Sequence, residues 1–392
     1  MSIAVDNEQA LLNAVKGVAG SVAAANADDV DRSARFPSEA IDALRDEHAL
    51  SAFVPTELGG GGVSLETIAQ CCLELGRHCG ASAMVFAMHQ IQVVTIVRHL
   101  EPDSWFEQYL REMLCPDQRL IASVTSEVGT GGDMGRSIAA VTPAGDGLVS
   151  FEKQAPTVSY GQHADDLLTT LRSGPDAEPG DQVALLTHKQ QATLEPTGTW
   201  DVLGMRGTCS PGFVVRGTAP EAQVLRAPFA RVAAESMVPV SHILWSHLWL
   251  GIAEDAFDRA RAFVRAAAKR KPGEPLPVAQ RLSRLMSELS MLRAEVDSAL
   301  RDFIVYSEEP GRERLSTMAA QLRFNNLKIA ASEHSADIAR GALDVCGIMG
   351  FKNDTPFSVG RHLRDTMSAA LMIANERIHE TNAGLLLIAK EV

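Results

Sequence analysis

The stretch LSTMAAQLRFNNLKIAASEHSADIARGALDVCG, Leu315–Gly347, decides the fold class, because it is a helical pattern that runs well over 20 residues without a break. Two stretches before it are similarly long, Ser246–Arg270 and Pro277–Val305, and a fourth helix is expected from about Ser368. These stretches carry apolar residues at helical spacing. Four long amphipathic helices with short joints predict an antiparallel four-helix bundle.

The sequence before the bundle has a different period. From about Leu120, short β-rich segments alternate with turn clusters that contain glycine and proline. They predict a small β domain that runs to about residue 230. The segments expected to be strands are RLIASVTS, GLVSFEKQA, DLLTTLRS, QVALLTHK and GFVVRGTA, which begin at Arg119, Gly147, Asp166, Gln182 and Gly212.

The first 115 or so residues again show helical spacing, interrupted by a loop at the four consecutive glycines Gly59–Gly62. We therefore predict an α+β fold that is mostly α and has three domains in chain order. They are an N-terminal helical domain (1–119), a middle β-barrel or β-sandwich domain (120–232) and a C-terminal four-helix bundle (233–392).

The composition excludes several classes of protein. The chain has 392 residues and a net charge of −13, so general nucleic-acid binding, which needs a basic surface, is excluded. The six cysteines fit no zinc spacing, and no metal site is predicted. The N-terminus lacks a signal-peptide pattern, and no apolar run approaches about 18 residues. We expect a cytoplasmic protein with reduced thiols and no membrane segment.

A glycine-rich segment follows the first predicted strand. In TSEVGTGGD, Thr125–Asp133, the glycines allow close backbone approach, and exposed N–H groups would hold an anionic or carbonyl-rich ligand. A plain glycine turn without a ligand is the alternative interpretation.

With this order of domains, five segments resemble motifs of the acyl-CoA dehydrogenase family of flavoproteins. TSEVGTGGD resembles the family's T-E-P-x-A-G-S-D, and APTVSYGQHAD, Ala155–Asp165, resembles W-I-T-N-G-x-x-A. LGMRGTCS, Leu203–Ser210, resembles L-G-x-R-x-T/S. DVCGIMGF, Asp344–Phe351, resembles Q-x-x-G-G-x-G-Y, and GRHLRD, Gly360–Asp365, resembles E-R-x-x-R-D.

The resemblance implies FAD as the cofactor, together with a homodimer or homotetramer whose subunits complete one another's FAD sites. It places Ser126, Glu127, Gly131 and Gly132 on the flavin segment and Thr157 and Ser159 against the isoalloxazine ring. The other predicted cofactor residues are Asp344 and Gly347 for the FAD of a neighbouring subunit, Arg270 or alternatively Arg265 for the pyrophosphate, and Asn375 and Arg377.

The resemblance also implies a reaction on the CH–CH group of an acyl thioester: FAD accepts a hydride at N5 from the β-carbon while a carboxylate removes the α-proton. Such a base must be aligned and partly desolvated, with a raised pKa. The two positions that carry it in the family correspond here to Ile373 and Ser241, so the usual base is absent. We predict Glu376 as a relocated base, because it would share a helical face with Ile373. His379 and His242 are the alternative candidates for the base. In the alternative interpretation of Glu376 itself, it is a solvated or ion-paired residue without a catalytic role.

Three functions stay open. The first is an acyl-CoA or acyl-carrier-protein dehydrogenase, with an electron-transfer flavoprotein or oxygen as the electron acceptor. The second is a two-component flavin monooxygenase of the same fold, a branch whose S-G-x-x-H-A segment resembles SYGQHAD with His163, although Met372 differs from the polar residue common there. The third is a flavin-binding or acyl-binding homologue that does not dehydrogenate. Trp245 and Trp249 form one helical stripe, expected in the core or at a pocket wall.

Overall fold

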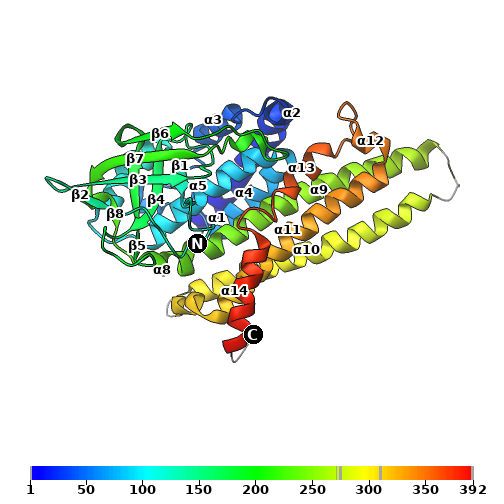
Figure 1. Ribbon diagram of the computed structural model, residues 1–392. Helices are drawn as coiled ribbons and strands as arrows, with labels where there is room; N and C mark the ends of the chain where they lie inside the picture. The colour runs from blue at the N-terminus through cyan, green and yellow to red at the C-terminus, as the bar shows by residue number, and fades with distance from the viewer. Residues whose placement is uncertain (1, 271, 273–275, 309–310, 390–392) are drawn as a thin grey trace.

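The computed structural model describes residues 2–270, 272, 276–308 and 311–389, with side chains from Asn7 onward. Its helices and sheets follow the predicted order, so the α+β, mostly α fold class is confirmed. Figure 1 shows the sheets at one end of the molecule, the long helices extending away from them, and the N-terminal helices packed between the two.

The N-terminal part is helical, as predicted. Ser64, after the four glycines, caps α4 by accepting a hydrogen bond from the Thr67 N–H at 3.3 Å. The helices of this part are α1 (Ser2–Val18), α2 (Ala24–Ser33), α3 (Ser38–Asp46), α4 (Leu65–His78), α5 (Gly80–Arg98), α6 (Trp105–Tyr109) and α7 (Cys115–Asp117).

Helix α5 corrects the expectation that no apolar run approaches the length of a membrane span. By length and composition alone, the helix Gly80–Arg98 could span a membrane. However, 89% of its apolar window is buried inside the chain, against α4, α9 and β1, which is also the environment of a core helix in a soluble protein.

The middle domain consists of two four-stranded sheets, and the five predicted strands are confirmed. Three strands, β2, β6 and β8, are not among those predicted, because β2 is exposed throughout, β6 ends in proline and β8 has only two residues. One sheet contains β1 (Ile121–Val124), β4 (Asp166–Arg172), β5 (Gln182–His188) and β8 (Val224–Leu225), with β1 parallel to β4. The other contains β2 (Thr142–Gly145), β3 (Leu148–Ala155), β7 (Phe213–Pro220) and β6 (Ala192–Pro196), all antiparallel.

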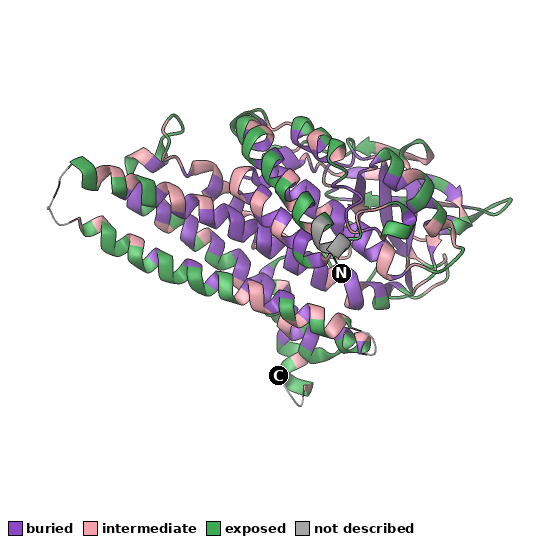
Figure 2. Cartoon of the chain, turned by 180° about the vertical axis from the view of Figure 1, so that it is seen from behind, coloured by how far each residue is buried: buried purple, intermediate pink, exposed green. Residues whose placement is uncertain are grey.

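Three helices of the C-terminal part are long, as predicted, and they pack side by side (Figure 1). Figure 2 shows exposed residues along the outer face of the middle one in sequence, α10, as expected for an amphipathic helix. The helices of this part are α8 (Phe229–Val232), α9 (Val238–Arg270), α10 (Pro277–Ser307), α11 (Met318–Cys346), α12 (Ile348–Phe351), α13 (Gly360–Met367) and α14 (Asn375–Ile388).

The fourth helix differs from the prediction. The sequence predicts one helix from about Ser368, but the chain turns between Met367 and Asn375 and divides into α13 and α14. Ile373 has a φ of +48°, a left-handed conformation that a β-branched residue rarely adopts and that cannot continue a right-handed helix.

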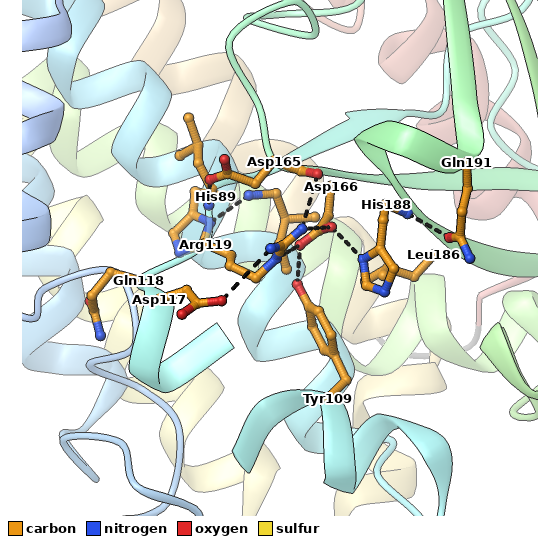
Figure 3. Close-up of polar contacts among 12 residues, drawn as sticks. His89, Tyr109, Asp117, Gln118, Arg119, Asp165, Asp166, Leu186, His188 and Gln191 are labelled. Atoms are coloured by element: carbon orange, nitrogen blue, oxygen red, sulfur yellow. Dashed lines mark hydrogen bonds and ion pairs between the residues drawn. The ribbon is translucent and has the colours of Figure 1, made fainter. Parts of the chain in front are cut away.

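A buried ionic network joins the N-terminal helices to the sheet that contains β1 (Figure 3). Asp166, fully buried at the start of β4, accepts hydrogen bonds from Tyr109 Oη at 2.6 Å and from Arg119 Nε and Nη2, both at 2.7 Å. His188 Nδ1 lies 2.7 Å from Asp166 Oδ1. Burial alone would raise the pKa of Asp166, but these hydrogen bonds hold the pKa below its ordinary value.

Candidate active-site cavity

A cavity of about 820 Å³ lies where the three parts of the chain meet. Its walls come from α5, the end of β1, the glycine segment, residues 200–210, the start of α9 and the joint between α13 and α14. Trp245 lines it, whereas Trp249 is fully buried in the core. Its large apolar side chains include Met84, Met88, Trp200, Met205, Trp245 and Met372.

The glycine segment forms one wall of the cavity and carries the Arg377 side chain on its surface. Gly131 and Gly132 have φ values of +63° and +84°, and a Cβ at either position would lie 3.3–3.4 Å from the Arg377 guanidinium. Arg377 comes from the first turn of α14 and lines the cavity. No carboxylate of the described residues forms an ion pair with it, so this cation is available to an anionic ligand.

Glu127, in the same segment, has a structural role rather than a place in the cavity. Its buried carboxylate accepts hydrogen bonds from Ser137 Oγ at 2.7 Å, Ile138 N at 3.1 Å and Ala139 N at 2.6 Å. Lys153 Nζ lies 3.7 Å away, and burial lowers the pKa of this lysine to about 8. These contacts close the loop that presents the glycines.

A row of hydroxyl groups lines the cavity beside the glycine segment. Ser126 Oγ donates to the Thr157 carbonyl oxygen at 2.6 Å, and Ser210 Oγ donates to Ser159 Oγ at 3.0 Å. Thr208 Oγ1 lies 2.8 Å from Ser210 Oγ. The structure thus brings six of the predicted cofactor residues to one cavity: Ser126, Gly131, Gly132, Thr157, Ser159 and Arg377.

Two further motifs meet at the edge of the cavity. A Cβ on Gly204 would lie 1.9 Å from the Arg364 carbonyl oxygen, so only glycine allows this approach. The Met205 N–H donates to Asp365 Oδ1 at 2.7 Å. Arg364 forms an ion pair with Asp31 and not with Glu376.

The remaining predicted cofactor residues do not line the cavity of a single chain. Arg270, its alternative Arg265, Asp344 and Gly347 are exposed in the second half of α9 or near the C-terminal end of α11. Asn375 is buried, and its amide group forms hydrogen bonds with residues of α11. Its Oδ1 accepts from Lys328 Nζ, and its Nδ2 donates to Ser332 and Glu333.

The structure does not bring Glu376 to the cavity. Glu376 and Ile373 do not share a helical face, contrary to the prediction, because α14 begins only at Asn375 and Ile373 lies in the preceding turn. Glu376 is exposed and outside the lining, and so is His379.

The other two candidate histidines also lie outside the lining. His242 is buried, its Nδ1 lies 3.0 Å from the Phe324 carbonyl oxygen, and burial lowers its pKa to about 3. His163 stacks on Phe36 with ring centroids 4.3 Å apart, and partial burial lowers its pKa.

The acid–base content of the cavity is therefore small. Among the described residues that line it, Asp133 is the only acidic side chain, and none is a histidine. Asp133 is exposed, and its Oδ1 accepts from the Gly135 N–H at 2.9 Å. The cavity presents an apolar interior, a row of hydroxyls and the cation of Arg377.

Several cavity residues were missed by the sequence analysis. Met84, Met88 and Ile91 lie on α5, which is buried on nearly all sides and has no apolar periodicity that would mark its cavity face. Trp200 lies in a loop without a motif.

Comparison with known proteins identifies the family. The profile of the acyl-CoA dehydrogenase N-terminal domain matches residues 5–114, and that of the C-terminal domain matches residues 231–376. The chain is 25% identical over 358 residues to an amino sugar nitrososynthase of Streptomyces peucetius, covering 88% of this chain and 84% of that protein. It is 24% identical over 361 residues to a probable FMNH₂-dependent monooxygenase of Pseudomonas putida, covering 88% and 87%. The solved structure of FMN-bound TdsC from Paenibacillus sp. A11-2 superposes with a TM-score of 0.80 at 20% identity, over 96% of this chain and 97% of that one.

The two family profiles together match more than half of the chain, in the predicted order of the helical parts. The chain belongs to the acyl-CoA dehydrogenase superfamily.

Proposed function

We propose that the protein is a flavin-dependent monooxygenase that transfers oxygen to a sulfur or nitrogen atom of a small apolar substrate. The observation that carries the proposal is the lack of a buried carboxylate or histidine among the described residues that line the cavity. Removing the α-proton of a thioester needs such a base, aligned and desolvated. Oxygen transfer to a heteroatom lone pair breaks no C–H bond and needs no such base.

The relatives support this class over the dehydrogenase. The names of two of them describe a nitrososynthase and an FMNH₂-dependent monooxygenase. A dehydrogenase would need the Glu376 carboxylate to move from its exposed position into the cavity, and the turn before α14 holds it outside.

The residues of the cavity fit a flavin. The hydroxyl groups of Ser126, Thr157 and Ser159 offer hydrogen bonds to the polar edge of the ring, and the apolar walls fit its faces. Arg377, lying on glycines that leave room for a ligand, would hold a phosphate. A bound reduced flavin supplies two electrons, so that one oxygen atom of O₂ enters the substrate and the other leaves as water.

We propose FMN rather than the FAD implied by the motifs. Two arginines line the cavity, but Arg364 is paired with Asp31, so Arg377 is the cation left for a single terminal phosphate among the described lining residues. The residues predicted for the adenine end of FAD lie outside the cavity of one chain. The relatives include a probable FMNH₂-dependent monooxygenase, and FMN-bound TdsC shares the fold. Reduced FMN would come from a separate reductase, and oxygen would be the electron acceptor.

The chain's own residues would select and shield the substrate. Met84, Met88, Trp245 and Met372 give an apolar surface that favours a neutral, flat molecule and excludes water from the reacting atoms.

We also propose a homodimer or homotetramer. Large apolar side chains are exposed at two places in the C-terminal part, Ile348 and Phe351 in α12 and Leu386–Ile388 in α14. Exposed apolar clusters of this kind mark interaction surfaces. A second subunit would also bring groups such as Arg270 to a flavin site.

The test supplies reduced FMN from a generic reductase and screens a thioether, a thiophene and an aromatic amine in air, with product masses as the readout. The proposal predicts a product one oxygen atom heavier that requires the protein. Acyl thioesters should not bleach the oxidised, flavin-bound protein without oxygen. Bleaching by a thioester, with formation of an unsaturated thioester, would contradict the proposal in favour of the dehydrogenase.

A further inference from the structure

A buried lysine lies directly behind one wall of the cavity. Lys328, in the middle of α11, is fully buried, and its Nζ donates to the Ile373 carbonyl oxygen at 2.8 Å and to Asn375 Oδ1 at 2.7 Å. Residues 368–374, which we call the wall turn, join α13 to α14. The wall-turn residues that line the cavity are Ser368, Leu371, Met372, Ile373 and Ala374.

The wall turn contains a backbone conformation that is unfavourable for its residue. Ile373 has a φ of +48°, which brings the Cβ of an L-residue close to the backbone and is least tolerated by β-branched side chains. Such a conformation persists only where surrounding contacts over-determine it.

The lysine is unfavourable in its position as well. Burial lowers the pKa of Lys328 to about 7, against a small opposing effect of Glu333. The two hydrogen bonds of its ammonium group reach across to the wall turn and to Asn375, not to its own helix. A lysine here therefore serves the turn and not the stability of α11.

Asn375 extends the contact into a small network. Its Nδ2 donates to Ser332 Oγ and to Glu333 Oε1, both at 3.1 Å, so the residue that starts α14 is bound to α11 through both ends of its amide. Together with Lys328, this network fixes the residues on the C-terminal side of the wall turn.

We propose that Lys328 is a positioning residue that holds Ile373 in its left-handed conformation and thereby sets the shape of the substrate-side wall of the cavity. The contact does not depend on the charge of the lysine, because a neutral amine retains two N–H donors for the two acceptors. The part of the proposal that concerns turnover rests on the monooxygenase function proposed above; the part that concerns the wall turn does not.

The test measures amide hydrogen exchange of the wall turn. The N–H groups of Leu371 and Met372 donate to the Ser368 carbonyl oxygen at 3.1 Å, and that of Asn375 donates to the Ala370 carbonyl oxygen at 3.0 Å. In Lys328→Met, which keeps the length of the side chain and loses its donors, exchange of these amides should accelerate by about tenfold or more. Unchanged exchange would overturn the proposal.

The matched control is Asn325→Ala. Asn325 is also buried on α11, one turn before Lys328, and its Nδ2 donates to Asn382 Oδ1 in α14 at 2.8 Å. This variant should accelerate exchange around Asn382 and leave the wall turn unchanged. Equal acceleration of the wall turn in both variants would show general loosening of α14 and would contradict a specific role of Lys328.

A second pair of variants isolates the strain. Ile373→Gly removes the penalty for positive φ, so adding Lys328→Met in that background should accelerate exchange less than it does in the native chain. Equal acceleration in both backgrounds would contradict the link between Lys328 and Ile373. Should Lys328→Met not fold, Asn375→Ala removes one of its two acceptors and should give the same change at smaller amplitude; no change there would count against the proposal.

The functional readout compares the KM for the substrate with the Kd for FMN. With a substrate found in the product screen, Lys328→Met should raise KM by about tenfold and change the Kd for FMN by less than about threefold, because the wall turn faces the substrate. An equal rise in both constants would contradict a substrate-side wall. If no substrate is found, the exchange measurements still decide the role of Lys328 in the wall turn.

Discussion

At the scale of single residues, the charge of Arg377 is the clearest pointer to a ligand. Its guanidinium lies over Gly131 and Gly132 inside the cavity, and no described carboxylate pairs with it. A cation placed in this way contributes most when an anion binds, because the hydrogen bonds to phosphate are charge-assisted.

Arg377→Met should therefore raise the Kd for FMN by about tenfold to a hundredfold, measured by flavin fluorescence. The Kd for riboflavin, which lacks the phosphate, should change little. Arg226→Met, which removes an exposed arginine outside the cavity, is the control and should leave the Kd for FMN unchanged. Equal weakening of FMN and riboflavin would contradict a phosphate contact.

The stability of the protein should depend on pH through Lys328. Its folded pKa is lowered to about 7, so above this pH the unfolded chain holds a proton that the folded chain has released. The free energy of unfolding should rise between about pH 7 and pH 10, at up to about 1.4 kcal/mol per pH unit from this group. Denaturant titrations should show a smaller slope in Lys328→Met; the same slope in both chains would contradict the lowered pKa.

Sequence reasoning located part of the cavity lining at this scale. Ser126, Gly131, Gly132, Thr157 and Ser159 follow from motifs, because each motif carries a local backbone shape with it. The position of Glu376 does not follow from a motif, because it depends on the left-handed conformation of Ile373. That conformation is held by Lys328, 45 residues earlier in the chain. A pattern of helical spacing contains no information about such a contact.

At the scale of elements, the prediction succeeded where a segment forms its structure from local periodicity. The long helices α9, α10 and α11 and the strand β3, whose buried and exposed residues alternate, show this. The prediction failed where tertiary contacts determine the structure of a segment. The strand β8 has two residues and exists through its pairing with β5, and the joint between α13 and α14 exists through α11.

The contact between β4 and the N-terminal helices gives a prediction at this scale. Asp166→Asn removes the charge that Arg119, Tyr109 and His188 share, and should lower the free energy of unfolding by about 3–5 kcal/mol. Asp117→Asn is the control, since Asp117 is exposed and lies 3.9 Å from the same arginine; it should cost less than about 1 kcal/mol.

The acid sensitivity of the protein should change with the same substitution. The pKa of Asp166 is lower in the folded chain than in the unfolded one. The stability that it contributes is therefore present above about pH 4, the unfolded value, and is lost as the pH falls through the folded value. Native protein should lose this stability in acid denaturation, and Asp166→Asn should show a weaker dependence on acid. Equal acid dependence in both would contradict the lowered pKa.

At the scale of the whole molecule, the order of helical, β and bundle parts was predictable because each part has its own period in the sequence. The cavity was not, because it forms where all three parts meet and its walls come from segments far apart in the chain. The fold fits both a dehydrogenase and a monooxygenase, so function rests on the contents of the cavity. Among the described lining residues, those contents are mainly apolar side chains, hydroxyls and Arg377, which forms no ion pair with a described carboxylate, and they include no desolvated base.

The most direct test of the monooxygenase account is the origin of the oxygen atom. The enzyme, reduced FMN and a substrate from the product screen are mixed under ¹⁸O₂ in ordinary water, and the mass of the product is measured by mass spectrometry. The account predicts one ¹⁸O atom in each product molecule, attached to sulfur or nitrogen. A product without the label, or desaturation of an acyl thioester with no oxygen incorporated, would contradict it.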